Sequence, residues 1–114
     1  MKRVFPPPVL ALPRADVPIK GVKAYLSQSG GHQVVFMTFS KKAEAPRHRH
    51  ESQWGIVIEG RIDLTIAGKK RTYFKGDRYY IPKGVYHSAT IFPGYSDITF
   101  FNQKDRYKEK RKEE

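Results

Sequence analysis

The chain of 114 residues contains no cysteine, no internal repeat and no apolar run long enough to cross a bilayer. Without thiols it can form neither a disulfide nor a thiolate metal site, so a transition metal would have to be held by nitrogen and oxygen ligands. Pro6, Pro7 and Pro8 interrupt the apolar stretch near the start, where a secretory signal would need its apolar core. We therefore expect a cytoplasmic protein without a membrane partner.

Acidic residues are scarce, with 11 aspartates and glutamates against 22 lysines and arginines and a formal net charge of +11. An excess of this size is common among nucleic-acid-binding proteins. Here, however, the basic residues are spread along the chain and accompany no groove-reading or RNA-stacking motif, so nucleic acid is only our third hypothesis. The abundance of lysine, arginine and glutamate without cysteine is also typical of thermophilic proteins.

Changes in composition along the chain divide it into three parts. Residues 1–19 form a proline-rich N-terminal arm, which we predict to be extended rather than helical because proline removes backbone donors. Residues 20–103 form the body of a single domain, which is long enough to bury one core. Residues 104–114 form a short charged C-terminal tail of mixed sign, which we predict to be a solvated end or a short helix.

The body of the chain consists of short segments rich in β-branched and aromatic residues, separated by glycine and proline turns. The segment 61–66 alternates, with Ile62, Leu64 and Ile66 on one face and polar residues on the other. Many short strands with turns at this spacing predict an all-β protein, either a sandwich or an antiparallel β-barrel.

Two histidines, His48 and His50, lie one residue apart before an apolar segment. In a strand such residues point to the same face, and two convergent imidazoles form half of a typical first-row metal site. The amide oxygen of Gln53 could be a third ligand. Taken alone, this pattern is also found in basic loops that bind nothing.

A further ligand would have to come from His32 or His87. His87 is the better candidate, because Pro82 and Gly84 precede it and hold the backbone at a defined angle. His32 follows two glycines and is expected to lie in a turn at the surface.

Together these residues resemble the two sequence motifs of the cupins, which are small jelly-roll β-barrels. The first motif is matched by His48, His50, Gln53 and Gly60, and the second by Gly76, Pro82, Gly84 and His87. The resemblance implies a metal inside the barrel, held by His48, His50, Gln53 and His87.

This sequence departs from the cupin pattern at three positions. Gln53 replaces the usual glutamate and lies one residue nearer to His50, Lys42 replaces a glycine, and Ile91 replaces an asparagine. A ligand set without a carboxylate leaves the full charge on a divalent ion, which makes it a stronger Lewis acid. Sequence does not distinguish Ni, Zn, Mn, Fe and Cu as the ion.

The first functional hypothesis is a metal-dependent isomerase, lyase or dioxygenase that acts on a small oxygenated molecule such as a sugar acid or keto acid. The alternative is a non-catalytic module that binds or senses a metal or small ligand. Cupins that linearise unsaturated uronates share the His-x-His-x-x-Gln-x-Gly pattern. Their catalytic aspartate has no clear counterpart in this chain, where Asp97 and Thr99 are the nearby candidates.

The remaining predictions concern the pocket and the assembly. As pocket residues we predict Met37, Tyr80 and Phe101. Trp54 alternates with Gln53 and should face away from the metal. Together with Ile56, Ile58 and the proline-rich arm it could form the contact of a homodimer.

Overall fold

The computed structural model describes residues 4–111, which form one short helix and nine strands. The helix is α1 (Pro7–Leu10). The strands are β1 (Val22–Gln28), β2 (Gln33–Phe39), β3 (Ala43–His48), β4 (Gln53–Glu59), β5 (Arg61–Ile66), β6 (Lys69–Phe74), β7 (Arg78–Ile81), β8 (His87–Ile91) and β9 (Ser96–Phe101). Among these residues no helix is long and apolar enough to cross a membrane.

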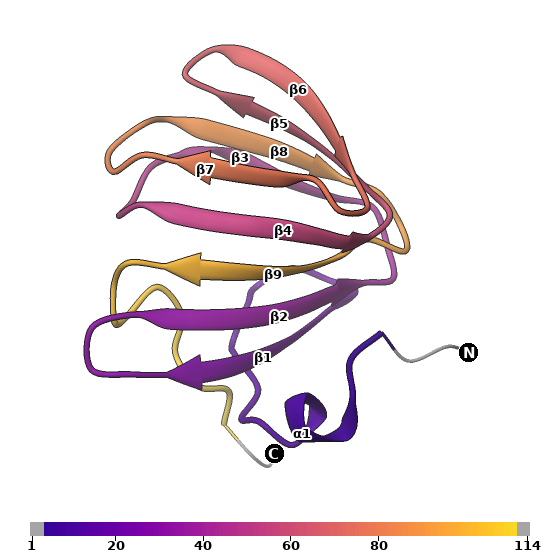
Figure 1. Cartoon of the computed structure of the whole chain (residues 1–114), viewed down its shortest axis with the longest axis vertical. Coiled ribbons are helices and arrows are strands. Elements are labelled where there is room, and N and C mark those ends of the chain that lie inside the picture. The colour runs from indigo at the N-terminus through magenta and orange to yellow at the C-terminus, as the bar shows by residue number, and fades with distance from the viewer. Residues whose placement is uncertain (1–3, 112–114) are drawn as a thin grey trace.

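The strands pair in an antiparallel manner and form two sheets. One sheet has five strands in the order β1-β2-β9-β4-β7, and the other has four in the order β3-β8-β5-β6. In Figure 1 the five-stranded sheet crosses the front of the view. Two antiparallel sheets packed around one core form a jelly roll, which confirms the predicted all-β fold class.

The core lies between the two sheets and follows from the alternation of side chains along each strand. In β2 every second residue from Gln33 to Phe39 is buried, and the residues between them are half-buried. Both sheets contribute large apolar side chains to one cluster, among them Val35, Ile62 and Phe101.

The prediction that the N-terminal arm contains no helix is wrong, because α1 is a single helical turn. Pro7 and Pro8 occupy its first positions, where backbone amides have no acceptor within the helix, so the missing N–H groups cost no hydrogen bond. Beyond this turn the arm is extended, and Arg14 pairs with Tyr25 of β1. The arm thereby covers the β1 edge of the five-stranded sheet.

The part of the tail that the structure describes contains no helix; most of its side chains are exposed, as predicted, but its backbone is held against the rest of the chain. After β9 the chain reverses and runs beside the N-terminal arm, where Glu109 pairs with Ala15. Gln33 anchors it, because its Nε2 donates to the Tyr107 carbonyl over 2.8 Å and its Oε1 accepts from the Tyr107 N–H over 3.0 Å. We call residues 102–111 the C-terminal segment.

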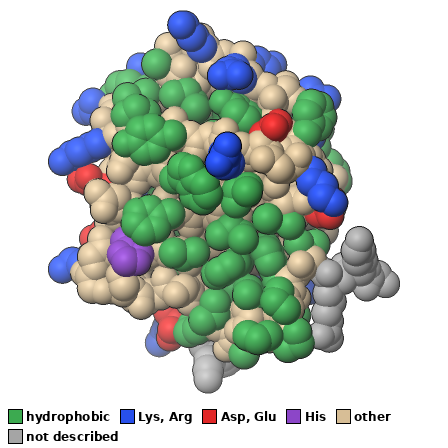
Figure 2. Space-filling view, in the orientation of Figure 1, with side chains coloured by type: hydrophobic (Ala, Val, Ile, Leu, Met, Phe, Trp, Pro, Cys, Tyr) green, Lys and Arg blue, Asp and Glu red, His purple; other side chains and the backbone are tan. Residues whose placement is uncertain are grey.

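The outward side of the five-stranded sheet is largely apolar. The register of the strands aligns its outward side chains in rows, which we call the outer apolar face: Val34, Phe36, Trp54, Ile56, Tyr80, Ile98 and Phe100. Trp54 is 40% exposed and faces away from the core as predicted, and Tyr80 is 58% exposed. Figure 2 shows hydrophobic side chains spread across this side of the molecule.

Candidate metal centre

Three of the four histidines meet at one end of the barrel. His48 ends β3, His87 begins β8, and the two residues are paired across these strands. His50 lies beyond the end of β3, so a single strand does not carry both His48 and His50 as predicted. Their rings nevertheless converge, with centroids 5.1 Å apart, and the candidate ligand atoms of all three histidines lie within 4.8 Å of one another.

A backbone carbonyl orients each of these imidazoles through Nδ1. The pairs are His48 with Pro46 at 2.8 Å, His50 with Glu51 at 2.7 Å and His87 with Val85 at 3.0 Å. Because a carbonyl oxygen can only accept, Nδ1 carries the proton in each ring, and Nε2 of the neutral ring keeps its lone pair. Histidines that bind metals usually have such a partner on the nitrogen that faces away from the ion.

The Nε2 atoms of His50 and His87 face each other at 3.2 Å. With Nδ1 protonated in both neutral rings, two lone pairs meet here without a proton between them, which is repulsive. Two nitrogens that bind one ion at about 2.0–2.1 Å lie roughly 2.8–3.4 Å apart at octahedral or tetrahedral angles. The donor set therefore fits a divalent metal, which would replace this repulsion with two coordinate bonds.

The surroundings favour the neutral form of these histidines. Burial, helped by the Arg106 guanidinium and opposed by the hydrogen bond to the Glu51 carbonyl, lowers the pKa of His50 to about 4. Burial also lowers the pKa of His87. Since neutral imidazole is the form that binds a metal, these two rings need not lose a proton to do so at neutral pH.

Gln53, the fourth predicted ligand, begins β4 and lines the same cavity as His48 and His87. The cavity lies between the sheets and has a volume of about 110 Å³. Sites for drug-sized ligands are typically about 300–1,000 Å³, so this cavity suits a much smaller molecule.

Of the three predicted pocket residues, Met37 and Phe101 line this cavity, whereas the prediction for Tyr80 is wrong. Adjacent residues of a strand point to opposite faces, and it is Tyr79 that takes the inward position while Tyr80 joins the outer apolar face. Gly55 makes room for the Tyr79 ring, because a Cβ at that position would lie 2.3 Å from Cζ of Tyr79.

Sequence reasoning missed two residues of the C-terminal segment, Arg106 and Tyr107, that line the cavity. Tyr107 packs edge-on against Phe101, with ring centroids 5.7 Å apart. The Arg106 guanidinium carbon lies 4.4 Å from the centroid of the Tyr107 ring and 5.6 Å from that of Phe101. The lone aromatic residue in an otherwise charged tail was the only signal in the sequence that this segment is partly buried.

Arg106 has no anionic partner within residues 4–111. Its Nε is buried without a hydrogen-bond partner, and the ion pairs of the described residues involve other side chains. Burying part of a cation without a counter-ion costs free energy. Its position is explained if an anion enters the cavity.

Asp97 and Thr99, the options for a catalytic aspartate, both line the cavity. Burial raises the pKa of Asp97 to about 7, although hydrogen bonds from the Tyr95 and Tyr79 hydroxyls oppose this rise. Asp97 is thus the acidic group of the cavity that could exchange a proton near neutral pH.

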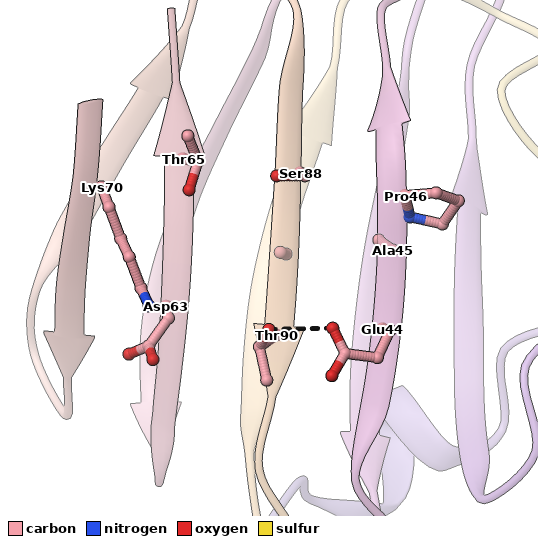
Figure 3. A pocket seen from close by; sticks show the side chains of 9 residues that line it. Glu44, Ala45, Pro46, Asp63, Thr65, Lys70, Ser88 and Thr90 are labelled. Carbon is pink, nitrogen blue, oxygen red and sulfur yellow. Dashed lines mark hydrogen bonds between the residues drawn. The ribbon is translucent and has the colours of Figure 1, made fainter. Parts of the chain in front are cut away.

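A more open depression of about 530 Å³ lies on the outer side of the four-stranded sheet (Figure 3). Its acidic side chains are already bonded. Glu44 accepts from the Thr90 hydroxyl over 2.9 Å, and Asp63 accepts from Arg61 and Thr72. The cavity with the histidines is therefore the better candidate for a functional site.

Two sheets in a jelly roll, with three convergent histidines at one end, define a β-barrel with a site suited to a divalent metal. A family model described as the cupin domain matches residues 35–100. The match spans more than half of the chain, which therefore belongs to the cupin family. No curated protein matches the chain.

Several solved structures share this fold. An RmlC-like cupin from Shewanella frigidimarina is 26% identical, with a TM-score of 0.71 over 82% of this chain and 86% of its own. KdgF from Halomonas sp. is 23% identical, with a TM-score of 0.68 over 80% of this chain and 87% of its own. Oxalate decarboxylase from Bacillus subtilis, a protein with Mn(II) centres, is 24% identical, with a TM-score of 0.65 over 80% of this chain and 27% of its own.

Proposed function

We propose that the protein is a mononuclear metalloenzyme that acts on a small oxygenated carboxylic acid, such as a sugar acid or keto acid. In this proposal His48, His50, His87 and Gln53 hold a divalent ion of Ni, Zn, Mn, Fe or Cu. The observation that carries it is the 3.2 Å approach of the Nε2 atoms of His50 and His87. Bound by neutral ligands, the ion would keep its full charge and act as a Lewis acid on a carbonyl or hydroxyl oxygen.

The position of Arg106 supports the proposal that the substrate carries a carboxylate. A guanidinium matches a carboxylate through two parallel hydrogen bonds, and this one lines the cavity without an ion pair among residues 4–111. Arg47 and Arg49 flank His48 in the sequence and stack on Tyr86 at 3.9 Å and 4.8 Å from its ring centroid. Together with the net charge of +11, these arginines would attract small anions to this end of the barrel.

The chain's own residues would position such an acid and shield it. Arg106 would orient the carboxylate, and Phe101 and Tyr107, which pack against each other, would exclude water from that end of the cavity. The placement supports isomerase, lyase and dioxygenase chemistry alike.

A non-catalytic role in binding or sensing a small ligand is the second candidate. The position of Asp97 favours this role, because the acidic group of the cavity lies away from the candidate metal site. Asp97 is four residues along β9 from Phe101, and Phe101 contacts His50. A turnover screen of metal-loaded protein with sugar acids, keto acids and catechols separates the two functions. Turnover that disappears in His87→Ala supports the enzyme, whereas binding without turnover supports the second candidate.

The metal site is tested by elemental analysis of wild type, His87→Ala and His32→Ala after loading with each candidate ion. His32 is the matched control, because it stacks on Phe100 of the outer apolar face. We expect about one ion per chain in wild type and His32→Ala, and a loss of bound metal in His87→Ala. Wild type that stays metal-free with every ion would contradict the proposal.

The anion site is tested by titrating metal-loaded protein with pyruvate and glycolate in a calorimeter. Arg106→Gln should weaken binding roughly 10- to 100-fold, as expected for the loss of hydrogen bonds between charged groups. Arg71→Gln, which removes the same charge from the exposed surface of β6, should bind as wild type. Equal weakening in both variants would mean that net charge, and not Arg106, attracts the acid.

We also propose that the protein is a homodimer whose contact is the outer apolar face. This face carries two large exposed aromatic side chains, Trp54 and Tyr80, and a contiguous exposed apolar patch is typical of a protein interface. The face lies on the opposite side of the sheet from the cavity, so pairing would leave the candidate site open.

A further inference from the structure

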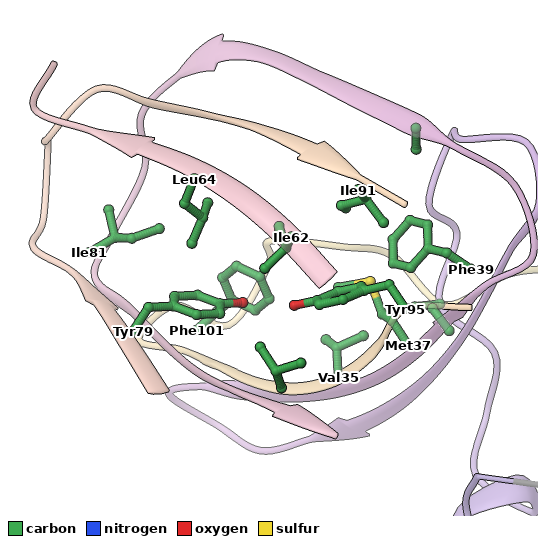
Figure 4. Close-up of a cluster of buried hydrophobic side chains, with 14 of the residues drawn as sticks. Val35, Met37, Phe39, Ile62, Leu64, Tyr79, Ile81, Ile91, Tyr95 and Phe101 are labelled. Carbon is green, nitrogen blue, oxygen red and sulfur yellow. The ribbon is translucent and has the colours of Figure 1, made fainter. Parts of the chain in front are cut away.

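The inner part of the cavity contains a second polar group with an unmet hydrogen bond. Asp97 is 4% exposed, and its Oδ2 accepts from the Tyr95 hydroxyl over 2.6 Å and from the Tyr79 hydroxyl over 3.3 Å. Its Oδ1 is also buried and has no hydrogen-bond partner among residues 4–111. Figure 4 shows the hydroxyls of Tyr79 and Tyr95 pointing toward each other in the middle of the apolar cluster.

No donor among residues 4–111 bonds to Oδ1, and much of the cavity wall is apolar. Met37, Phe39, Ile62, Leu64 and Ile91 line the same cavity and carry no donor. A buried carboxyl oxygen without a partner costs free energy, and neither tyrosine hydroxyl bonds to it. A molecule that enters the cavity can supply the missing hydrogen bond.

We propose that Asp97 determines specificity by accepting a hydrogen bond from a hydroxyl group at the far end of the bound acid. The inference rests on the proposed function, in which Arg106 holds the carboxylate, and it adds a second required group at a defined distance. The cavity would then select a hydroxy acid over the same acid without its hydroxyl, because only the first satisfies Oδ1.

The dimensions of the cavity limit the length of such an acid. Phe101 pairs with Gln53 at the end near the histidines, and Asp97 is four residues away on the same strand. At about 3.3 Å per residue this separation is roughly 13 Å along the backbone, and side chains from both ends shorten it. The Arg106 guanidinium carbon lies 5.6 Å from the centroid of the Phe101 ring, at the same end as Gln53. With C–C bonds of about 1.5 Å, an acid of roughly four to six carbons would therefore extend from Arg106 to Asp97.

The test compares pairs of acids that differ by one terminal hydroxyl. Zinc-loaded wild type is titrated in a calorimeter with butyrate and 4-hydroxybutyrate, pentanoate and 5-hydroxypentanoate, and hexanoate and 6-hydroxyhexanoate. At one of these lengths the hydroxy acid should bind about tenfold tighter or more, as expected for a hydrogen bond to a carboxylate. Equal affinities within every pair would overturn the proposal. Because this comparison uses only wild type, it does not depend on whether a variant folds.

Asp97→Leu then assigns the preference to this residue. The variant should bind the hydroxy acid no more tightly than the parent acid, while its affinity for the parent acid stays at the wild-type value. Glu44→Leu, which removes an exposed carboxylate outside the cavity, should keep the preference. A preference that persists in Asp97→Leu overturns the proposal.

The outcomes also separate this inference from the proposed function. If the acids bind through Arg106 but show no preference for the hydroxyl, only the role of Asp97 fails. If no acid of either series binds to metal-loaded wild type, both the proposed function and the role of Asp97 fail.

Discussion

Asp97 is a carboxyl group in an apolar core, and its burial raises its pKa from the ordinary value of 3.8 to about 7. The folded protein therefore holds a proton that the unfolded chain releases between about pH 4 and pH 7. Because the folded state binds more protons in this window, the contribution of Asp97 to stability is complete below pH 4 and is lost as the pH rises to 7. The rate of loss is at most about 1.4 kcal/mol per pH unit.

Asp97→Asn cannot ionise and should not show this loss. Relative to wild type, the free energy of unfolding of the variant should rise by roughly 2 kcal/mol between pH 5 and pH 8. Urea unfolding of both proteins at several pH values measures this difference, and the buried histidines, which the two proteins share, cancel in it. A difference that stays constant with pH would mean that Asp97 ionises in the folded protein as it does in the unfolded chain.

At the scale of the element, the C-terminal segment is held by its packing and not by its own propensity. Gln33 is fully buried, and its side-chain amide is bonded to the backbone of Tyr107. Truncation after Gln103 should lower the free energy of unfolding by roughly 3 kcal/mol or more, because it exposes the cavity and removes the bonds between the Gln33 amide and the backbone of Tyr107. The temperature of unfolding measures the effect.

Tyr107→Phe is the control for this truncation, since it keeps both the aromatic ring and the backbone that Gln33 contacts. It should unfold close to the wild-type temperature. If the truncated chain is as stable as wild type, the segment does not contribute to the fold, and its residues would not be positioned well enough to act in the cavity.

For the whole molecule, the outer apolar face predicts a homodimer of twice the chain mass of 13.2 kDa. Trp54→Glu should convert the dimer to a monomer, because it places a charge in the centre of the contact. Phe74→Glu, which alters another exposed aromatic residue on β6, should stay dimeric. Light scattering coupled to gel filtration measures the mass, and a wild-type mass of one chain excludes this interface.

Much of the barrel could be predicted because strands and turns are local features of a sequence. The alternation of Ile62, Leu64 and Ile66 predicts a strand, which β5 confirms, and Gly60 and Gly68 lie just beyond its two ends. His87 could be grouped with His48, almost forty residues earlier, because the chain resembles both cupin motifs. Local patterns did not show that β3 ends at His48, since the strand end depends on pairing with β8.

By itself, the sequence determined the class of fold, the three candidate metal-binding histidines and the exclusion of thiolate chemistry. The fold class and the exclusion of thiolates follow from residue type and short-range spacing, whereas the grouping of His87 with His48 and His50 follows from the resemblance to the two cupin motifs. Only the tertiary structure decided that Tyr79 and not Tyr80 faces inward, and that Arg106 and Tyr107 enter the cavity. These facts depend on strand register and on the return of the C-terminal segment across the barrel, which are set by packing between residues far apart in the chain.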